Sequence, residues 1–127
     1  MKARDSTLRL KRFEVAERAR KAVDMEQMVR DFEQMISDLD RQITTEEERT
    51  GVRDANHFAY STFAKAAALR RDNLATSVGD LKAKLDIARR EHDEVLDELR
   101  RLEATEARDS VIDRGRGRND RPEAAAS

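Results

Sequence analysis

Hydrophobic residues recur with a seven-residue period along two stretches of the chain, from residue 6 to about 49 and from 62 to about 109. In each stretch they occupy positions a and d of six consecutive heptads abcdefg. Nine of these twelve positions are apolar in the first stretch and ten of twelve in the second. Three or four such heptads already indicate a coiled coil, so two helices of about 65 Å each are predicted.

The a and d positions together form what we call the seam. In the first helix the seam comprises Leu8, Lys11, Val15, Arg18, Ala22, Met25, Val29, Phe32, Ile36, Leu39, Ile43 and Glu46. In the second helix it comprises Ala64, Ala67, Arg71, Leu74, Val78, Leu81, Leu85, Ala88, His92, Val95, Leu99 and Leu102.

Turn-forming residues separate the two helices and follow the second. A connector is predicted over about 50–61, with Asp5 or Ser6 as the N-cap of the first helix and Ser61 or Thr62 as that of the second. Residues 110–127 contain arginine, glycine, one proline and alanine, cannot bury apolar area, and are expected to be a disordered tail.

The distribution of charge predicts how the helices pair. Residues 1–21 hold eight basic and three acidic residues, whereas 22–48 hold two and nine. The second helix repeats this, with seven basic and three acidic residues over 65–90, then two and seven over 91–107. Basic starts and acidic ends oppose the helix macrodipole, but antiparallel pairing sets each basic start beside an acidic end. The prediction is an all-α fold, a long two-helix antiparallel coiled-coil hairpin over residues 1–109.

Two registers match apolar residues across the seam. Pairing positions whose numbers sum to 110 sets Val15 beside Val95 and Met25 beside Leu85, and puts Arg18 and His92 in one layer. A sum of 103 moves basic residues 82–90 towards the basic start of the first helix, so we prefer 110.

Composition narrows the functional classes. Of 127 residues, 42% are charged and 4% aromatic, with few glycines and prolines, which excludes a β-sandwich or barrel. The net charge of −1 gives no reason to expect a nucleic-acid partner, and four arginines in the tail are a weak signal for one. We expect no secretory signal and no membrane span.

Catalytic motifs are absent from the sequence. It has no cysteine, no His-Glu-x-x-His and no glycine-rich phosphate loop, and His57 and His92 lie 35 residues apart. We expect no enzyme activity, cofactor or metal. The run Glu46–Glu48 is better explained as a solvated helix end than as a metal site, and His92 as a polar register marker than as a pH sensor.

Apolar residues outside the seam are the candidates for partner binding. A narrow seam leaves the hairpin marginal alone, and Leu10, Phe13 and Leu96 lie off it near the open end, while Met28 and Met35 occupy g positions. Three of the five aromatic residues cluster in or beside the connector, where they either form a contact surface or plug the end of the coiled coil. They are Phe58, Tyr60 and Phe63.

Four segments resemble a known family. They are RDSTLRLKRF at 4–13, GVRDANHFAY at 51–60, AKAAA at 64–68 and RRDNL at 70–74. The chain is similar over residues 1–107 to the flagellar export protein FliJ family in its alphaproteobacterial form.

The resemblance implies a cytoplasmic stalk component of the bacterial flagellar type III export apparatus, peripherally associated with the inner membrane. Its partners would be the export ATPase ring, the membrane export gate protein and export chaperones. By analogy, the open end with Leu8, Leu10, Phe13, Leu99 and Leu102 would engage the ATPase ring. The chain would be monomeric alone; the alternative is a generic coiled-coil scaffold or dimerisation adaptor.

Overall fold

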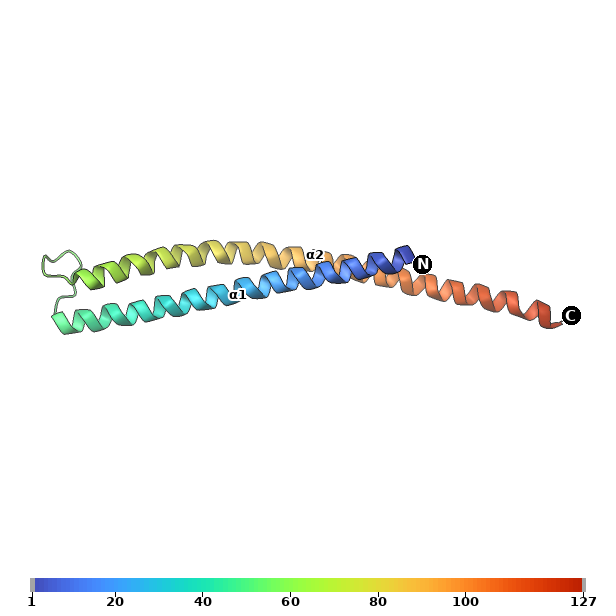
Figure 1. Ribbon diagram of the computed structural model, residues 1–127, viewed down its shortest axis with the longest axis horizontal. Helices are drawn as coiled ribbons and strands as arrows, with labels where there is room; N and C mark the ends of the chain where they lie inside the picture. The colour runs from blue at the N-terminus through green and yellow to red at the C-terminus, as the bar shows by residue number, and fades with distance from the viewer. Residues whose placement is uncertain (1, 127) are drawn as a thin grey trace. The chain divides into compact units, whose positions relative to one another are not determined.

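A computed structural model describes the backbone of residues 2–126 and the side chains of residues 3–115. It contains two α-helices, α1 (Lys2–Thr50) and α2 (Thr62–Ala126), joined by a loop over residues 51–61. The helices pack antiparallel, with α1 drawn in blue to green and α2 in green to red (Figure 1). The predicted all-α, two-helix antiparallel hairpin is therefore confirmed.

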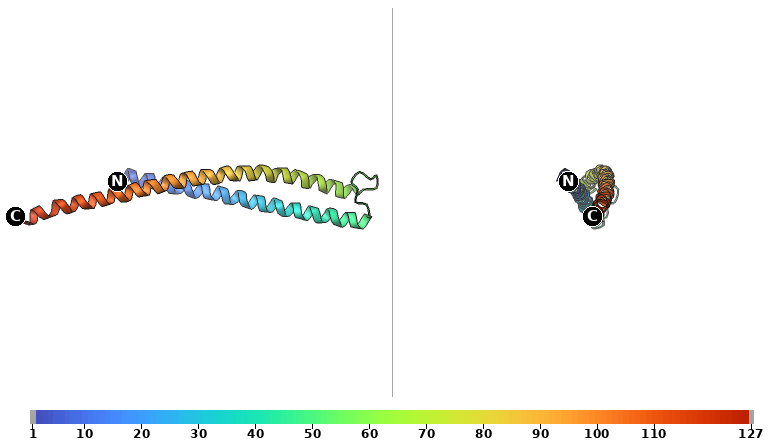
Figure 2. Two further views of the ribbon diagram at one scale, coloured as in Figure 1. Left: turned by 180° about the vertical axis from the view of Figure 1, so that it is seen from behind. Right: turned by 90° about the vertical axis from the view of Figure 1, so that its right-hand side faces the viewer.

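The chain divides into two compact units, and both helices contribute to each. Unit 1 comprises Met1–Ala19 and Arg90–Ser127, and unit 2 comprises Arg20–Arg89. Within unit 2 the two helices lie side by side in both Figure 1 and Figure 2. Neither helix, over its described residues, has an apolar stretch sufficient to cross a membrane.

The first helix begins earlier than predicted. α1 starts at Lys2, so neither Asp5 nor Ser6 is its N-cap. Asp5 instead lies in the first turn, where its negative charge interacts favourably with the positive end of the helix dipole. The Thr7 hydroxyl donates to the Ala3 carbonyl oxygen at 2.9 Å, a contact typical of a residue inside a helix.

The second helix ends later than predicted, at Ala126 rather than near residue 109. Backbone hydrogen bonding continues the helix, but packing does not accompany it: Val111 and Ile112 are exposed. Arg4 and Asp109 form the cross-helix ion pair farthest along α2 among the described side chains, at 3.1 Å. The side chains of residues 116–127, most of the predicted tail, lie outside the described residues, and disorder there stays a prediction.

The seam is the core of both units. Every a and d residue is buried or half-buried. All the apolar side chains that are buried within residues 3–115 belong to it. The heptad assignment made from the sequence is therefore confirmed at the level of individual side chains.

One apolar cluster of unit 2 supports the proposed register. Ala22 of α1 forms it with Leu85 and Ala88 of α2, and Met25 packs against them. This grouping sets Met25 level with Leu85, as a pairing sum of 110 requires. A sum of 103 would place Met25 opposite Val78 instead.

Ion pairs between the helices join basic starts to acidic ends. In unit 2 they are Arg71–Asp40 at 3.1 Å, Lys82–Glu33 at 3.5 Å and Arg89–Glu26 at 2.9 Å. In unit 1 they include Arg4–Glu106 at 3.3 Å, Lys11–Glu98 at 2.7 Å, Arg12–Glu103 at 3.4 Å and Arg18–Glu91 at 2.5 Å. Each is partly exposed and contributes little alone because solvent screens it, but together they favour antiparallel over parallel pairing.

Replacing Leu85 by aspartate tests the seam. Because Leu85 is buried, Leu85→Asp removes its apolar contacts and buries an unpaired carboxylate, which should destabilise the hairpin by at least about 2 kcal/mol. The measurement is thermal unfolding followed by circular dichroism. Leu69→Asp, at an exposed position of the same helix, is the matched control and should leave the melting temperature nearly unchanged. Equal melting of both variants would show that the seam is wrongly assigned.

Candidate functional site

Hydrogen bonds close both helix ends at the loop. Gly51 follows α1 with a φ of 75°, in the left-handed region that favours glycine, and its N–H donates to the Glu47 carbonyl oxygen at 2.9 Å. At the start of α2, the Ala64 N–H donates to the Ser61 hydroxyl oxygen at 3.2 Å. This contact confirms Ser61, one of the two predicted residues, as the N-cap.

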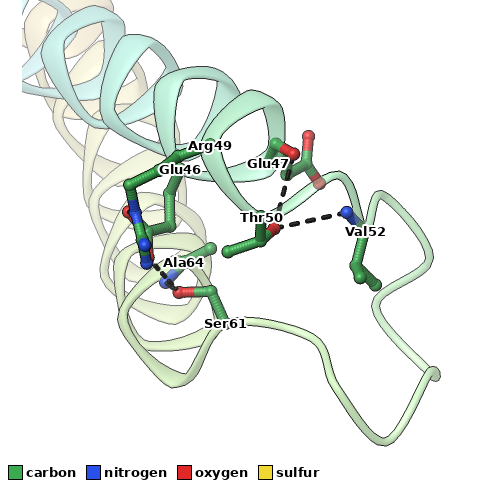
Figure 3. Close-up of polar contacts among 7 residues, drawn as sticks. All are labelled: Glu46, Glu47, Arg49, Thr50, Val52, Ser61 and Ala64. Atoms are coloured by element: carbon green, nitrogen blue, oxygen red, sulfur yellow. Dashed lines mark hydrogen bonds and ion pairs between the residues drawn. The ribbon is translucent and has the colours of Figure 1, made fainter.

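Glu46 links the two helix ends (Figure 3). The Ser61 hydroxyl donates to Glu46 Oε1 at 2.9 Å, and Arg49 Nε donates to Glu46 Oε2 at 3.0 Å. The Arg49 guanidinium, followed by the Ser61 hydroxyl, lowers the pKa of the Glu46 carboxyl from 4.5 to about 2. Only 17% of the Glu46 side chain is exposed, so the expectation of a simply solvated helix end is wrong for this residue.

Two of the three predicted aromatic candidates, Tyr60 and Phe58, lie in different environments. Tyr60 is half-buried and packs against the cluster that contains Leu39 and Ile43, and its hydroxyl donates to Glu47 Oε2 at 2.8 Å. This bond to a carboxylate raises the pKa of Tyr60. Tyr60 thus plugs the end of the coiled coil, which is one of the two roles considered for these residues.

Phe58 has the opposite environment. Its side chain is 96% exposed and stacks on the His57 ring, with ring centroids 4.6 Å apart. The surrounding turn is ordered by local bonds, because the Asn56 N–H donates to Asp54 Oδ1 at 2.9 Å and the Ala59 N–H to His57 Nδ1 at 3.0 Å. Phe58 is therefore held outward on a structured turn, where a partner can reach it.

The third aromatic residue, Phe63, lies at the start of α2 and is 57% exposed. It lines a shallow hollow with Asp38, Gln42 and Thr45 of α1. Phe63 therefore lies on the flank of the hairpin, apart from the turn that carries Phe58.

The structure brings together two of the three candidates predicted near the open end. Leu10 and Phe13 are 70% and 64% exposed and line one hollow on α1 with Ser6 and Arg9. They occupy positions c and f, on the side of α1 that faces away from the seam. Leu96 occupies an e position beside the seam and is half-buried, so it contributes less to an accessible surface.

The polar residues of the seam have partners that the sequence analysis missed. Lys11 Nζ lies 2.7 Å from Glu98 Oε2 and 3.0 Å from Glu14 Oε2. The Glu98 contact, followed by that of Glu14, raises the pKa of Lys11, and Lys11 lowers that of Glu98. Lys11 and Glu98 carry opposite charges at positions whose numbers sum to about 110, as do Arg18 and Glu91. A search of the sequence for opposite charges at such positions could have found these pairs.

No metal site is evident in the described part of the chain, where no three His, Asp or Glu side chains are placed to bind one ion. His57 lies in the loop of unit 2. His92 is half-buried in the seam of unit 1, with Nδ1 3.4 Å from Asp93 Oδ1.

Glu46 should make stability depend on pH. A carboxyl whose folded pKa lies below its unfolded value stabilises the fold fully above the unfolded pKa, and that stabilisation is lost as the pH falls through the folded pKa. We expect the wild-type melting temperature to fall between about pH 4.5 and 2 more steeply than that of Glu46→Gln. At pH 7, Glu46→Gln should be the less stable protein. Glu48→Gln, at an exposed position, is the control; equal pH profiles for all three proteins would contradict the assignment.

The two loop aromatics should differ in their effect on folding. Tyr60→Ala removes packing from the adjacent cluster and the bond to Glu47, and should destabilise the protein by about 2 kcal/mol. Phe58→Ala should change stability by less than about 0.5 kcal/mol, because its side chain is solvent-exposed. Urea unfolding measures both. A large destabilisation by Phe58→Ala would mean that this residue also serves as a plug.

The comparisons with known proteins found no relative of this chain. No family model, no curated protein and no solved structure matches the chain. The similarity to a flagellar export family thus rests on the four sequence segments quoted above, and the structure adds support only for the two-helix antiparallel architecture.

Proposed function

We propose that this protein is a non-enzymatic component of a bacterial flagellar type III export apparatus. In this role it is a coiled-coil stalk that links the export ATPase ring to the membrane export gate. It also assists chaperone and substrate handling during flagellum assembly. Its location is the cytoplasm, at the cytoplasmic face of the inner membrane, and it needs no cofactor.

The observation that carries the proposal is the exposed pair Leu10 and Phe13 on a hairpin that does not need them for folding. Both side chains lie outside the seam, which already contains the buried apolar residues of the described chain. Large exposed apolar side chains grouped in one place are typical of protein-contact sites. Their position on unit 1, which holds the chain's N-terminal segment, matches the part of the stalk expected to meet the ATPase.

The architecture is a second support. An antiparallel hairpin with flanking ion pairs is suited to a binding stalk, because its outer faces stay free for partners while the seam maintains the fold. Phe58, on the loop of unit 2, provides a separate exposed residue for a second partner such as the gate.

Binding to the export ATPase tests the proposal. We expect the full chain to retain the purified ATPase in a pull-down, and Leu10→Ser with Phe13→Ser to weaken this binding at least about tenfold, since each truncation removes an exposed apolar contact. Leu69→Ser, an equally exposed leucine in unit 2, is the matched control and should bind as the wild type does. Helicity by circular dichroism should be the same in all three proteins.

Two results would contradict the stalk. One is no binding to either the ATPase or the export gate protein. The other is a stable self-associated species in sedimentation velocity, which would favour the alternative of a generic coiled-coil scaffold or dimerisation adaptor.

A further inference from the structure

The two flanks of the seam in unit 2 differ in how they are closed. On the flank formed by the e positions, Glu26 pairs with Arg89 and Glu33 with Lys82. The opposite flank is formed by the g positions, where three exposed apolar side chains lie among basic and polar ones. We call its exposed apolar residues, Met28 and Met35 of α1 and Phe63 of α2, the methionine face.

The two methionines of the methionine face are exposed and lie one heptad apart. Met28 and Met35 are 45% and 43% exposed, and their seven-residue spacing places them two helical turns apart, about 10.5 Å. Phe63 extends the face towards the loop, where it lines a hollow with Asp38 and Gln42 of α1. Methionine side chains are flexible and polarisable, which suits them to packing against varied apolar partners.

Aspartates border this face on the α1 side with the same period. Asp24, Asp31 and Asp38 occupy successive c positions, next to the g positions around the helix. Asp38 pairs with Arg41, whereas Asp31 accepts a hydrogen bond from the Gln27 amide at 2.8 Å and Asp24 is exposed. This edge therefore presents negative charge at a spacing that matches the methionines.

The α2 side of the face has the opposite charge. Arg70 and Lys84 are exposed at g positions of α2, and Asp80 is exposed at a neighbouring c position, so two cations outnumber one carboxylate. A helix lying along the methionine face thus meets aspartates on its α1 side and an excess of positive charge on its α2 side. This asymmetry selects for an element whose two edges also differ in charge.

We infer that the methionine face binds an amphipathic α-helix of another protein, with lysine or arginine at heptad spacing along the edge that meets Asp24, Asp31 and Asp38. Apolar residues of that helix lie on Met28 and Met35, and its other edge is acidic or neutral. Helices of this kind bind grooves through anchors at i, i+3, i+4 and i+7. The inference does not depend on the export role.

A second copy of this chain is a poorer occupant. A stable protein–protein interface buries about 800 Å² on each partner, and three partly exposed side chains supply only a small part of that area. A single helix needs less surface, because it can lie along the methionine face and contact the charged residues on both sides. We therefore assign the face to a helical segment of a different protein.

Two labelled peptides test the inference against the full chain. Both have three heptads with leucine at a and d; one carries lysine along a single flank, and the other carries glutamate there. By fluorescence anisotropy, we expect the lysine peptide to bind about tenfold more tightly than the glutamate peptide, and this preference to shrink as salt is raised.

Matched variants locate the binding. Asp24→Lys with Asp31→Lys should reverse the preference between the peptides, whereas Glu48→Lys, at an exposed f position of α1, should not. Met28→Ser with Met35→Ser should weaken both peptides about tenfold, and Leu69→Ser should leave them unchanged. Circular dichroism checks that each variant keeps its helicity.

The opposite outcomes would overturn the inference. Equal affinity for the two peptides would remove the role of the aspartates, and equal weakening by Leu69→Ser would show that binding is non-specific. A dimer in sedimentation velocity that is lost in the Met28→Ser, Met35→Ser variant would assign the face to a second copy of the chain.

Discussion

The narrow apolar seam between two antiparallel helices is the interaction on which the rest of the structure depends. The buried apolar side chains of the described residues all lie in it, so neither helix has an alternative core. Over the paired region, residues 1–48 and 65–107, each helix also begins basic and becomes acidic, an order that opposes the helix dipole. Packing the helices together offsets both problems, because it covers the apolar stripe and sets each basic start beside an acidic end.

The loop end shows how a hairpin with so little core is terminated. Gly51 supplies the left-handed residue that ends α1, Ser61 caps α2, and Glu46 bonds to the Ser61 hydroxyl across the gap. Tyr60 then covers the last apolar cluster. These contacts complete the fold at the loop end while the Phe58 side chain remains in solvent.

Much of this arrangement could be predicted from the sequence, because a heptad pattern is a local property that maps directly onto one face of a helix. The seam follows from it, and the capping preference of serine and threonine limited the N-cap of α2 to Ser61 or Thr62, of which the structure shows Ser61. The start of α1 was not predicted correctly, because an aspartate such as Asp5 is favourable both as an N-cap and within the first turn of a helix. The difference between Tyr60 and Phe58 also could not be predicted, because it depends on how an irregular loop folds back onto α1. Leu96 was grouped with the exposed candidates, yet its e position places it beside the seam.

The charged residues within the seam have a mechanical consequence. Lys11, Arg18 and Arg71 each interrupt the apolar stripe and each reach a carboxylate on the opposite helix. Sliding one helix past the other by a heptad would move these cations about 10 Å from their partners while leaving apolar residues matched. Electrostatics therefore resists axial slippage that hydrophobic packing alone would tolerate.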